Sequence, residues 1–381
     1  MKKIIFCFAL LIFLCSSAFA NDESEKMLED FSNEYEKMFE DALEEGEQED
    51  FLDFDPEKII KNAASGRELF SIKELFEKTA KKFFYEAVLA AKSMLAIFAV
   101  SILAAFLFSE KGGENSASDG VRLCVYMICA GISISLFSKI SETAVEAVHN
   151  LSLFLKSVFP VLLASLCSSG CISSAAVIQP VVAAAIQLSV HLAEKFFIPL
   201  ITVSFAVCSV NMLSKEINAD KFILFLQKCV KTCLAAMLII FIGLVGIESM
   251  ATGAVDGISV KLTKFAASNL VPIVGGILSE SVETVMGCSM IIKNSAGICG
   301  ILAIAYICLS PLIKLGASIA VLKLSAAVLE PVGDSRITKC IWDMSGAASY
   351  LFATVASVAV MFILITAIII NTGNRVLITG G

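Results

Sequence analysis

The feature that most constrains this chain is a series of apolar runs, each about as long as a helix that crosses a bilayer. An α-helix needs about 20 residues to span the hydrocarbon core. The candidate spans are residues 88–108, 121–137, 151–166, 172–190, 196–213, 233–250, 297–317 and 350–370. They lack the alternation of membrane β-strands. We therefore expect an all-α polytopic membrane protein with seven or eight transmembrane helices.

The shorter run at 321–329 carries Lys323 and is predicted to be re-entrant or interfacial. The overall composition agrees with a membrane protein, since 57% of the 381 residues are hydrophobic and 17% are charged. Soluble domains are about 45–50% apolar and about 25% charged.

The first twenty residues have the pattern of a secretory signal peptide. Lys2 and Lys3 form a basic start, residues 4–14 an apolar centre, and Ala18-Phe19-Ala20 a small-residue cleavage site. We expect cleavage before Asn21, which leaves the mature N-terminus outside the cytoplasm.

Residues 21–87 are predicted to be an acidic and amphipathic extracytoplasmic region, followed by a polytopic helical domain at 88–381. Leu28, Phe31, Tyr35, Met38 and Leu43 recur at the spacing of a one-faced helix. Such a helix would meet a partner, whereas a solvated and partly disordered segment is the alternative. A second amphipathic helix is predicted at 65–86.

Basic residues indicate which loops face the cytoplasm. The stretch 214–231 carries four lysines, and 323–349 carries Arg336 and Lys339 among others. With an outside N-terminus and eight spans, both fall on the cytoplasmic side, as the positive-inside rule predicts. Lys78, Lys81 and Lys82, just before the first span, fall on the opposite side, so the agreement is partial.

The stretch 253–276 is too polar for an ordinary span and too apolar for an ordinary loop. It places Lys261 and Lys264 opposite an apolar face, with Asp256 at the margin. A lysine against lipid costs about 2.5–3.5 kcal/mol, so these side chains must face water, an anion or a carboxylate. Candidate pore-lining or interface residues are Asp256, Lys261, Lys264, Lys293 and Lys323. The alternative is a helix lying flat at the headgroups.

Small residues and prolines indicate where helices pack closely or kink. Gly253 and Gly257 form a small-x-x-x-small pattern. The serine- and alanine-rich stretch 159–180 favours helix packing over a substrate path. The candidate packing or kink positions are Pro160, Gly170, Pro180, Gly253, Gly257, Pro272, Gly275 and Gly276.

Residue types that carry enzyme chemistry are scarce. The thirteen cysteines include no C-x-x-C pair, only two histidines occur, and no phosphate-binding loop or nucleophile elbow is found. We therefore predict no enzyme activity, no catalytic or metal site, no cofactor and no nucleic-acid partner.

Four long strings resemble the stage III sporulation protein AE family of endospore-forming bacteria. They are "FPVLLASL...SSAAVIQP", "GAVDGISVKLTKFAASNLVPIVGGILSESVETVMGCSMIIKNSAG", "PLIKLGASIAVLKLSAAVLEPVGDSRI" and "LFATVASVAVMFILITAIIINTGN". The resemblance covers roughly residues 121–374 and is strongest after Gly253.

The resemblance implies a membrane subunit of a secretion-like channel complex that links mother cell and forespore and is required for forespore development after engulfment. It further implies a multi-pass position in the mother-cell membrane around the forespore. The partners implied are other stage III sporulation A-type proteins, including an ATPase and ring-forming subunits, with membrane lipid around them; homo-oligomerisation stays open. A stand-alone secondary transporter and a structural anchor without a transport path are the alternatives.

Overall fold

A computed structural model describes residues 72–109, 116–213, 219–243, 275–331 and 333–380, together with positions 59 and 62. The secondary structure in these ranges is helical and contains no strand, which confirms the all-α class. Six of the described helices are long and apolar enough to cross a membrane. The total of seven or eight spans stays a prediction, because residues 244–274 lie outside the described ranges, as do the signal peptide and the acidic segment at 21–58.

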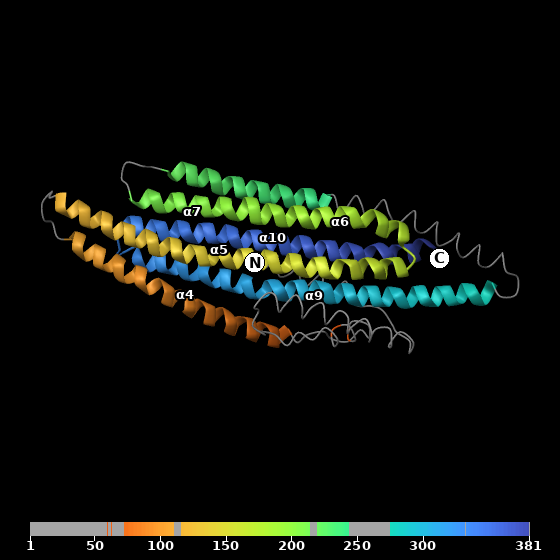
Figure 1. Cartoon of the computed structure of the whole chain (residues 1–381). Helices are drawn as coiled ribbons and strands as arrows, with labels where there is room; N and C mark the ends of the chain where they lie inside the picture. Colours follow the sequence, from red (N-terminus) through yellow and green to blue (C-terminus); the bar gives the residue numbers. More distant parts are fainter. Residues whose placement is uncertain are drawn as a thin grey trace.

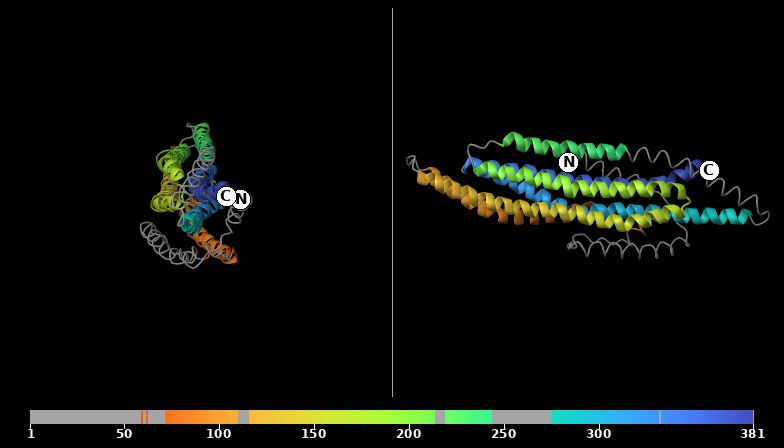
Figure 2. Two further views of the ribbon diagram at one scale, coloured as in Figure 1. Left: turned by 90° about the vertical axis from the view of Figure 1, so that its right-hand side faces the viewer. Right: turned by 45° about the horizontal axis from the view of Figure 1, so that its top comes forward.

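The helices lie side by side along one axis and form an elongated bundle (Figures 1 and 2). They are α4 (Ile72–Ser109), α5 (Ser116–Ser168), α6 (Ile172–Leu192), the π-helix η1 (Ala193–Phe197), α7 (Ile198–Leu213), the helix at Asp220–Gly243, α9 (Gly275–Leu329) and α10 (Ser335–Gly380). α6, η1 and α7 follow one another without a break and make one helical rod.

The helices are much longer than a membrane is thick. α5 has 53 residues, and at 1.5 Å per residue it is about 80 Å long. The hydrocarbon core of a bilayer measures about 30 Å. One bilayer therefore holds less than half of α5, and the bundle extends well beyond it.

The two spans predicted at 121–137 and 151–166 imply a loop at 138–150. This prediction is wrong, because α5 is continuous through the stretch. The polar residues here face outward, as exposed Glu142 and Glu146 show, while Ala144, Ala147 and Val148 are buried against the bundle. The dip in hydropathy along the sequence marks an amphipathic section of helix, whose backbone hydrogen bonds stay within the helix.

Two further breaks predicted between apolar runs are likewise absent. Residues 191–195 connect the runs at 172–190 and 196–213 through η1, so these runs belong to one rod. The run at 321–329, predicted to be re-entrant or interfacial, is the last part of α9 and continues directly from 297–317.

A tight turn connects α5 to α6 at the far end of the bundle. Gly170 has a φ of 86°, a conformation that glycine adopts without a steric penalty. The amide of Cys171 donates to the carbonyl of Leu166, and the amide of Gly170 donates to the carbonyl of Cys167. These two bonds form a Schellman motif, which ends α5 and reverses the chain.

The reversed chain returns along α5 in a constant antiparallel register. The rings of Phe137 and Phe205 stack with centroids 4.3 Å apart, and the hydroxyls of Ser141 and Thr202 are 3.3 Å apart. Further along, Nδ1 of His149 lies 3.9 Å from Oε1 of Glu194. In this register, the polar stretch that follows the apolar run 121–137 of α5 lies beside the start of the apolar run 196–213 in the α6–α7 rod.

α9 and α10 form the most buried hairpin of the bundle, and glycine permits their close approach. A Cβ atom added to Gly297 would lie 2.2 Å from Cγ1 of Ile370, far closer than a real contact allows. Ala296, Cys299, Ala303 and Ile304 of α9 are also fully buried. Small residues on α9 therefore set the spacing of the central helix pair.

We expect Gly297→Ala to destabilise the protein by about 1–3 kcal/mol, because the new methyl group overpacks the α9–α10 contact. Thermal unfolding of the full chain in detergent measures the effect. Combining Gly297→Ala with Ile370→Ala should recover part of the loss, since the second change removes the clashing atoms. Gly316→Ala, which meets no atom closer than 3.9 Å, serves as the matched control.

The continuity of α5 can be tested with its own cysteines. Cys124 and Cys167 are both exposed, and their separation of 43 positions corresponds to about 65 Å of helix. In variants whose only cysteine is Cys124 or Cys167, a membrane-impermeant maleimide should reach the two positions from opposite sides of the membrane. Labelling of both from the same side would contradict a single rod.

Candidate functional site

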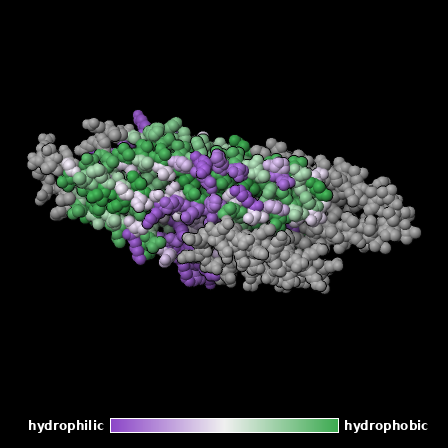
Figure 3. All heavy atoms as spheres, viewed as in Figure 1, coloured by the Kyte–Doolittle hydropathy of each residue, from purple (hydrophilic) through white to green (hydrophobic). Residues whose placement is uncertain are grey.

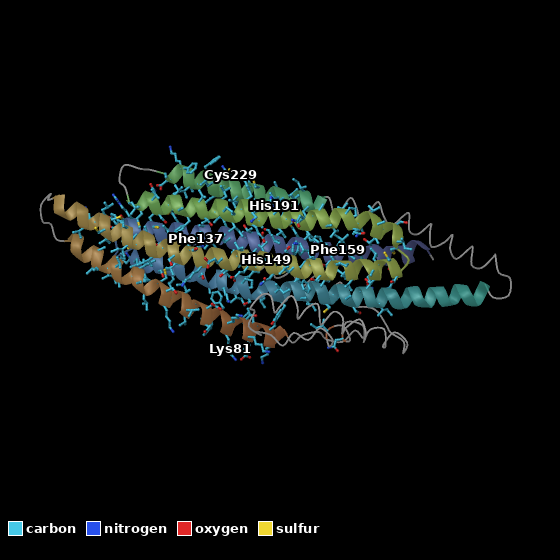
Figure 4. The ribbon with its side chains drawn as sticks, viewed as in Figure 1. Lys81, Phe137, His149, Phe159, His191 and Cys229 are labelled. Atoms are coloured by element: carbon cyan, nitrogen blue, oxygen red, sulfur yellow. The ribbon has the colours of Figure 1, made fainter. Side chains whose placement is uncertain are left out.

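Charged side chains from five helical elements gather at one level near the middle of the bundle, and we call this set the charged belt. It consists of Lys81 of α4, Lys139, Glu142, Glu146 and His149 of α5, His191 of α6, Glu194 and Lys195 of η1, and Lys314 of α9. Figure 3 shows hydrophilic side chains across the middle of the surface. Figure 4 shows Lys81, His149 and His191 at the same position along the bundle.

The charged belt contains few long-range bonds among the described residues. The His149–Glu194 pair is 3.9 Å long, and the His149 side chain is 61% exposed. Lys81 pairs with Glu77 one turn earlier on α4, at 2.8 Å. Ser138 donates a hydrogen bond to Glu142, also one turn away. Since most of these contacts lie within one helix, the outward groups stay available to solvent or a partner.

The π-helix η1 lies within the charged belt. Its wider turn leaves both Ala193 and Phe197 buried while Glu194 stays beside α5. Single π-turns inside α-helices are rare and occur frequently at functional sites. The irregularity thus coincides with the level at which charges interrupt the apolar surface.

A groove of about 380 Å³ opens between α5 and α7 at the charged belt, and we call it the α5–α7 groove. Phe137 and Phe205 provide apolar lining, and Glu142 and Glu146 provide carboxylates. The full lining is Ile134, Phe137, Ser138, Ser141, Glu142, Val145, Glu146, Thr202, Phe205 and Ala206. This combination suits an amphipathic group that carries a positive charge.

A second polar set, which we call the end cluster, ties helices together near the end of the bundle where α5 begins. We call the part of the bundle between the charged belt and the end cluster the apolar half. The Tyr126 hydroxyl of α5 donates to Oδ2 of Asp334 at 3.0 Å. Oδ1 of Asp334 accepts the amide of Arg336 at 2.9 Å, so Asp334 caps the start of α10. The Arg336 guanidinium lies 5.4 Å from the Tyr126 ring centroid, within cation–π range.

The other members of the end cluster hold the 220–243 helix and α7 against α10. Asp220 accepts hydrogen bonds from Asn211 at 2.9 Å and from Lys339. The Cys208 thiol donates to Asp343 at 3.4 Å. Sequence reasoning missed Tyr126, Asp220, Asp334 and Asp343. The "GDS" string before α10 was the available signal, since aspartate is a preferred N-cap residue.

The structure separates the predicted pore-lining residues. Lys293 and Lys323 are both on α9, but their 30-residue separation corresponds to about 45 Å. Lys293 is fully buried, and its Nζ has no hydrogen-bond partner among the described residues. Lys323 is exposed. Asp256, Lys261 and Lys264 lie outside the described residues.

The predicted packing and kink residues fall at several kinds of position. Pro160 lies inside α5 and Pro180 inside α6, so neither ends its helix. Gly170 forms the α5–α6 turn. Gly275 and Gly276 are the first residues of α9. Gly253, Gly257 and Pro272 lie outside the described residues.

Among the described residues, most buried side chains are apolar, and Phe137, Phe154, Phe197 and Phe362 are nearly or fully buried. Ten cysteines whose side chains the structure describes form no disulfide with one another, and six of them are buried. In the part of the chain that the structure describes, no group of three or more histidine, cysteine, aspartate or glutamate side chains is placed to hold a metal ion.

Comparison with known proteins gives two matches. A sequence model described as Stage III sporulation protein AE matches residues 54–373. The chain is 28% identical over 312 residues to the Stage III sporulation protein AE of Bacillus subtilis (strain 168), which covers 81% of this chain and 78% of that protein. No solved structure matches.

We expect Asp334→Ala to destabilise the bundle by about 2 kcal/mol, because it removes a helix cap and a hydrogen bond, each contributing about 1 kcal/mol. Tyr126→Phe should cost about 1 kcal/mol. The double variant should cost less than the sum, since both changes remove the same bond. Thermal unfolding in detergent measures all three, and strict additivity would contradict the Tyr126–Asp334 contact.

Proposed function

Because the chain belongs to the stage III sporulation protein AE family, we propose that it is the membrane subunit of a secretion-like channel complex linking mother cell and forespore. The role in sporulation follows from the family. In this proposal the subunit supports forespore development after engulfment, with other stage III sporulation A-type proteins, including an ATPase and ring-forming subunits, as its partners.

The observation that carries this proposal is the close-packed apolar interior of the described part of the bundle. Buried phenylalanines on α5, η1 and α10 occupy the centre of the bundle. A protein that transports alone requires a binding cavity or path between its own helices. A close-packed interior instead favours a path formed between copies or with partners, which is how a subunit of a larger complex would act.

The dimensions of the bundle support a particular membrane position. From Tyr126 in the end cluster to Glu142 in the charged belt is 16 positions of α5, or about 24 Å. From Glu194 to Asn211 is 17 positions of the α6–α7 rod, or about 26 Å. Both lengths are close to the hydrocarbon thickness of about 30 Å. We place this half of the bundle in the mother-cell membrane.

The exposed side chains support the same position. Several large apolar residues in this half have exposed surfaces: Leu95 of α4; Met127 and Ile128 of α5; Val203 and Val210 of α7; and Phe222, Leu224 and Phe225 of the 220–243 helix. Lipid chains suit such a surface. The part of the bundle beyond the charged belt, toward the α5–α6 turn, then projects from the membrane. With the end cluster on the cytoplasmic side, this part is extracytoplasmic.

One observation favours the alternative of a stand-alone secondary transporter. Lys293 is fully buried without a hydrogen-bond partner among the described residues. Buried ionisable groups in membrane helices often belong to a substrate or ion path. Lys293 is one buried lysine without a partner in the described part of the chain, whereas buried apolar side chains extend along the bundle, so we rank this function second.

Purification of the tagged full chain from sporulating cells tests the proposal. We expect other stage III sporulation A-type proteins to copurify in stoichiometric amounts after solubilisation in a mild detergent. The control is an unrelated polytopic membrane protein tagged in the same way. Recovery of the chain without these proteins would support the stand-alone transporter instead.

A further inference from the structure

The amphipathic part of α4 and the α5–α7 groove are complementary in charge and shape. On α4, Phe76, Phe84 and Tyr85 are 76%, 70% and 65% exposed, and Lys81 is exposed among them. The groove offers apolar lining with carboxylates at Glu142 and Glu146. One surface is aromatic and basic, and the other is a hollow with acidic groups.

The exposed face of α4 lies away from its own bundle. Lys82 donates to Ser310 of α9 at 2.8 Å, and Phe83 lies beside Gly316 of the same helix. Tyr85 lies one turn after Lys81 on the same face of α4, which points away from α9, and it is exposed. The pairing of Lys81 with Glu77 is an exposed contact within one helix, worth about 0.3–0.5 kcal/mol, and it does not prevent Lys81 from engaging a second carboxylate.

Exposed lysines in the apolar half mark helix surfaces that need a polar partner there. They are Lys92 of α4, Lys228 and Lys231 of the 220–243 helix, and Lys323 of α9. Lys92 is exposed between Leu89 and Leu95, both of which are also exposed. A lysine in contact with lipid chains costs about 2.5–3.5 kcal/mol at the bilayer centre. Contact with another polypeptide that offers an acceptor removes this cost, whereas the neighbouring leucines alone would tolerate lipid.

The two surfaces lie at the same height along the bundle. α4 ends and α5 begins at the same end of the molecule (Figure 1). Lys81 lies 28 positions before Ser109, and position 144, between Glu142 and Glu146, lies 28 positions after Ser116. Both are therefore about 42 Å from that end. Two copies standing upright in one membrane can make contact only between surfaces at equal heights.

We propose that the amphipathic face of α4, formed by Lys81, Tyr85, Val88 and Leu89, binds the α5–α7 groove of a second copy of this chain. Lys81 faces Glu142 and Glu146 of the second copy. Tyr85 reaches the hydroxyls of Ser138 and Ser141, and Val88 with Leu89 covers Ile134. Because the two surfaces differ, the interface is heterologous, and its repetition generates a ring or an open chain of copies.

Site-specific photocrosslinking tests this contact in the full-length protein. A benzophenone amino acid at position 85 should crosslink two copies in lipid nanodiscs or native membranes. Mass spectrometry of the product should place the second attachment site within 134–146 of α5 or 202–206 of α7. Crosslinks between the α4 helices of two copies, or crosslinks to lipid alone, would overturn the proposal.

Charge reversal provides a second measurement. We expect Lys81→Glu and Glu146→Lys each to weaken self-association about fivefold, as like charges at an interface repel, and the double variant to restore it. Lys156→Glu, at an exposed position in the other half of α5, is the matched control and should leave self-association unchanged. Failure of the double variant to recover, with both single variants folded, contradicts the pairing. Self-association of the purified chain is measured without the other sporulation proteins, so the result is independent of the proposed complex.

Discussion

The constraint on which the rest of the structure depends is that backbone amides and carbonyls must find their hydrogen-bond partners within helices wherever lipid surrounds them. The chain meets this requirement by keeping its helices continuous across the charged belt. Only the outward side chains change there, while Ala144, Ala147 and Val148 continue the buried stripe. Turns such as the one at Gly170 are found at the ends of the described bundle, where the reversal satisfies its own polar groups.

Sequence reasoning predicted the all-α class because the length and apolar character of a spanning helix are local properties of the chain. It failed at 138–150 and 191–195, where mean hydropathy falls but the helix continues. Averaging over a window hides which face of a helix carries the polar residues. A wheel drawn for Ala144, Ala147 and Val148 against Glu142 and Glu146 would have indicated an amphipathic helix instead of a loop.

The candidate site was less accessible to prediction, since its parts come from distant sections of the chain. Tyr126 meets Asp334, and His149 meets Glu194, only after the helices have taken their register. No spacing in the sequence encodes these contacts. Lys293 was predicted to be a pore-lining or interface residue, and its complete burial depends on how α9 is covered by its neighbours. The lysines at 261 and 264 lie outside the described residues, so their role stays a prediction.

The two polar levels of the bundle differ in what they contribute to stability. Three hydrogen bonds of the end cluster join residues 119 to 208 positions apart, namely Lys339–Asp220, Cys208–Asp343 and Tyr126–Asp334, and so fix the relative positions of four helices. The bonds of the charged belt lie mostly within one helix, and such exposed pairs contribute about 0.3–0.5 kcal/mol each. These charges stabilise the fold only slightly, yet they replace apolar side chains on the surface. Apolar side chains at the same positions could bury more area against a neighbouring surface. Stability therefore does not account for the charged belt, which agrees with the proposed contact with another polypeptide at this level.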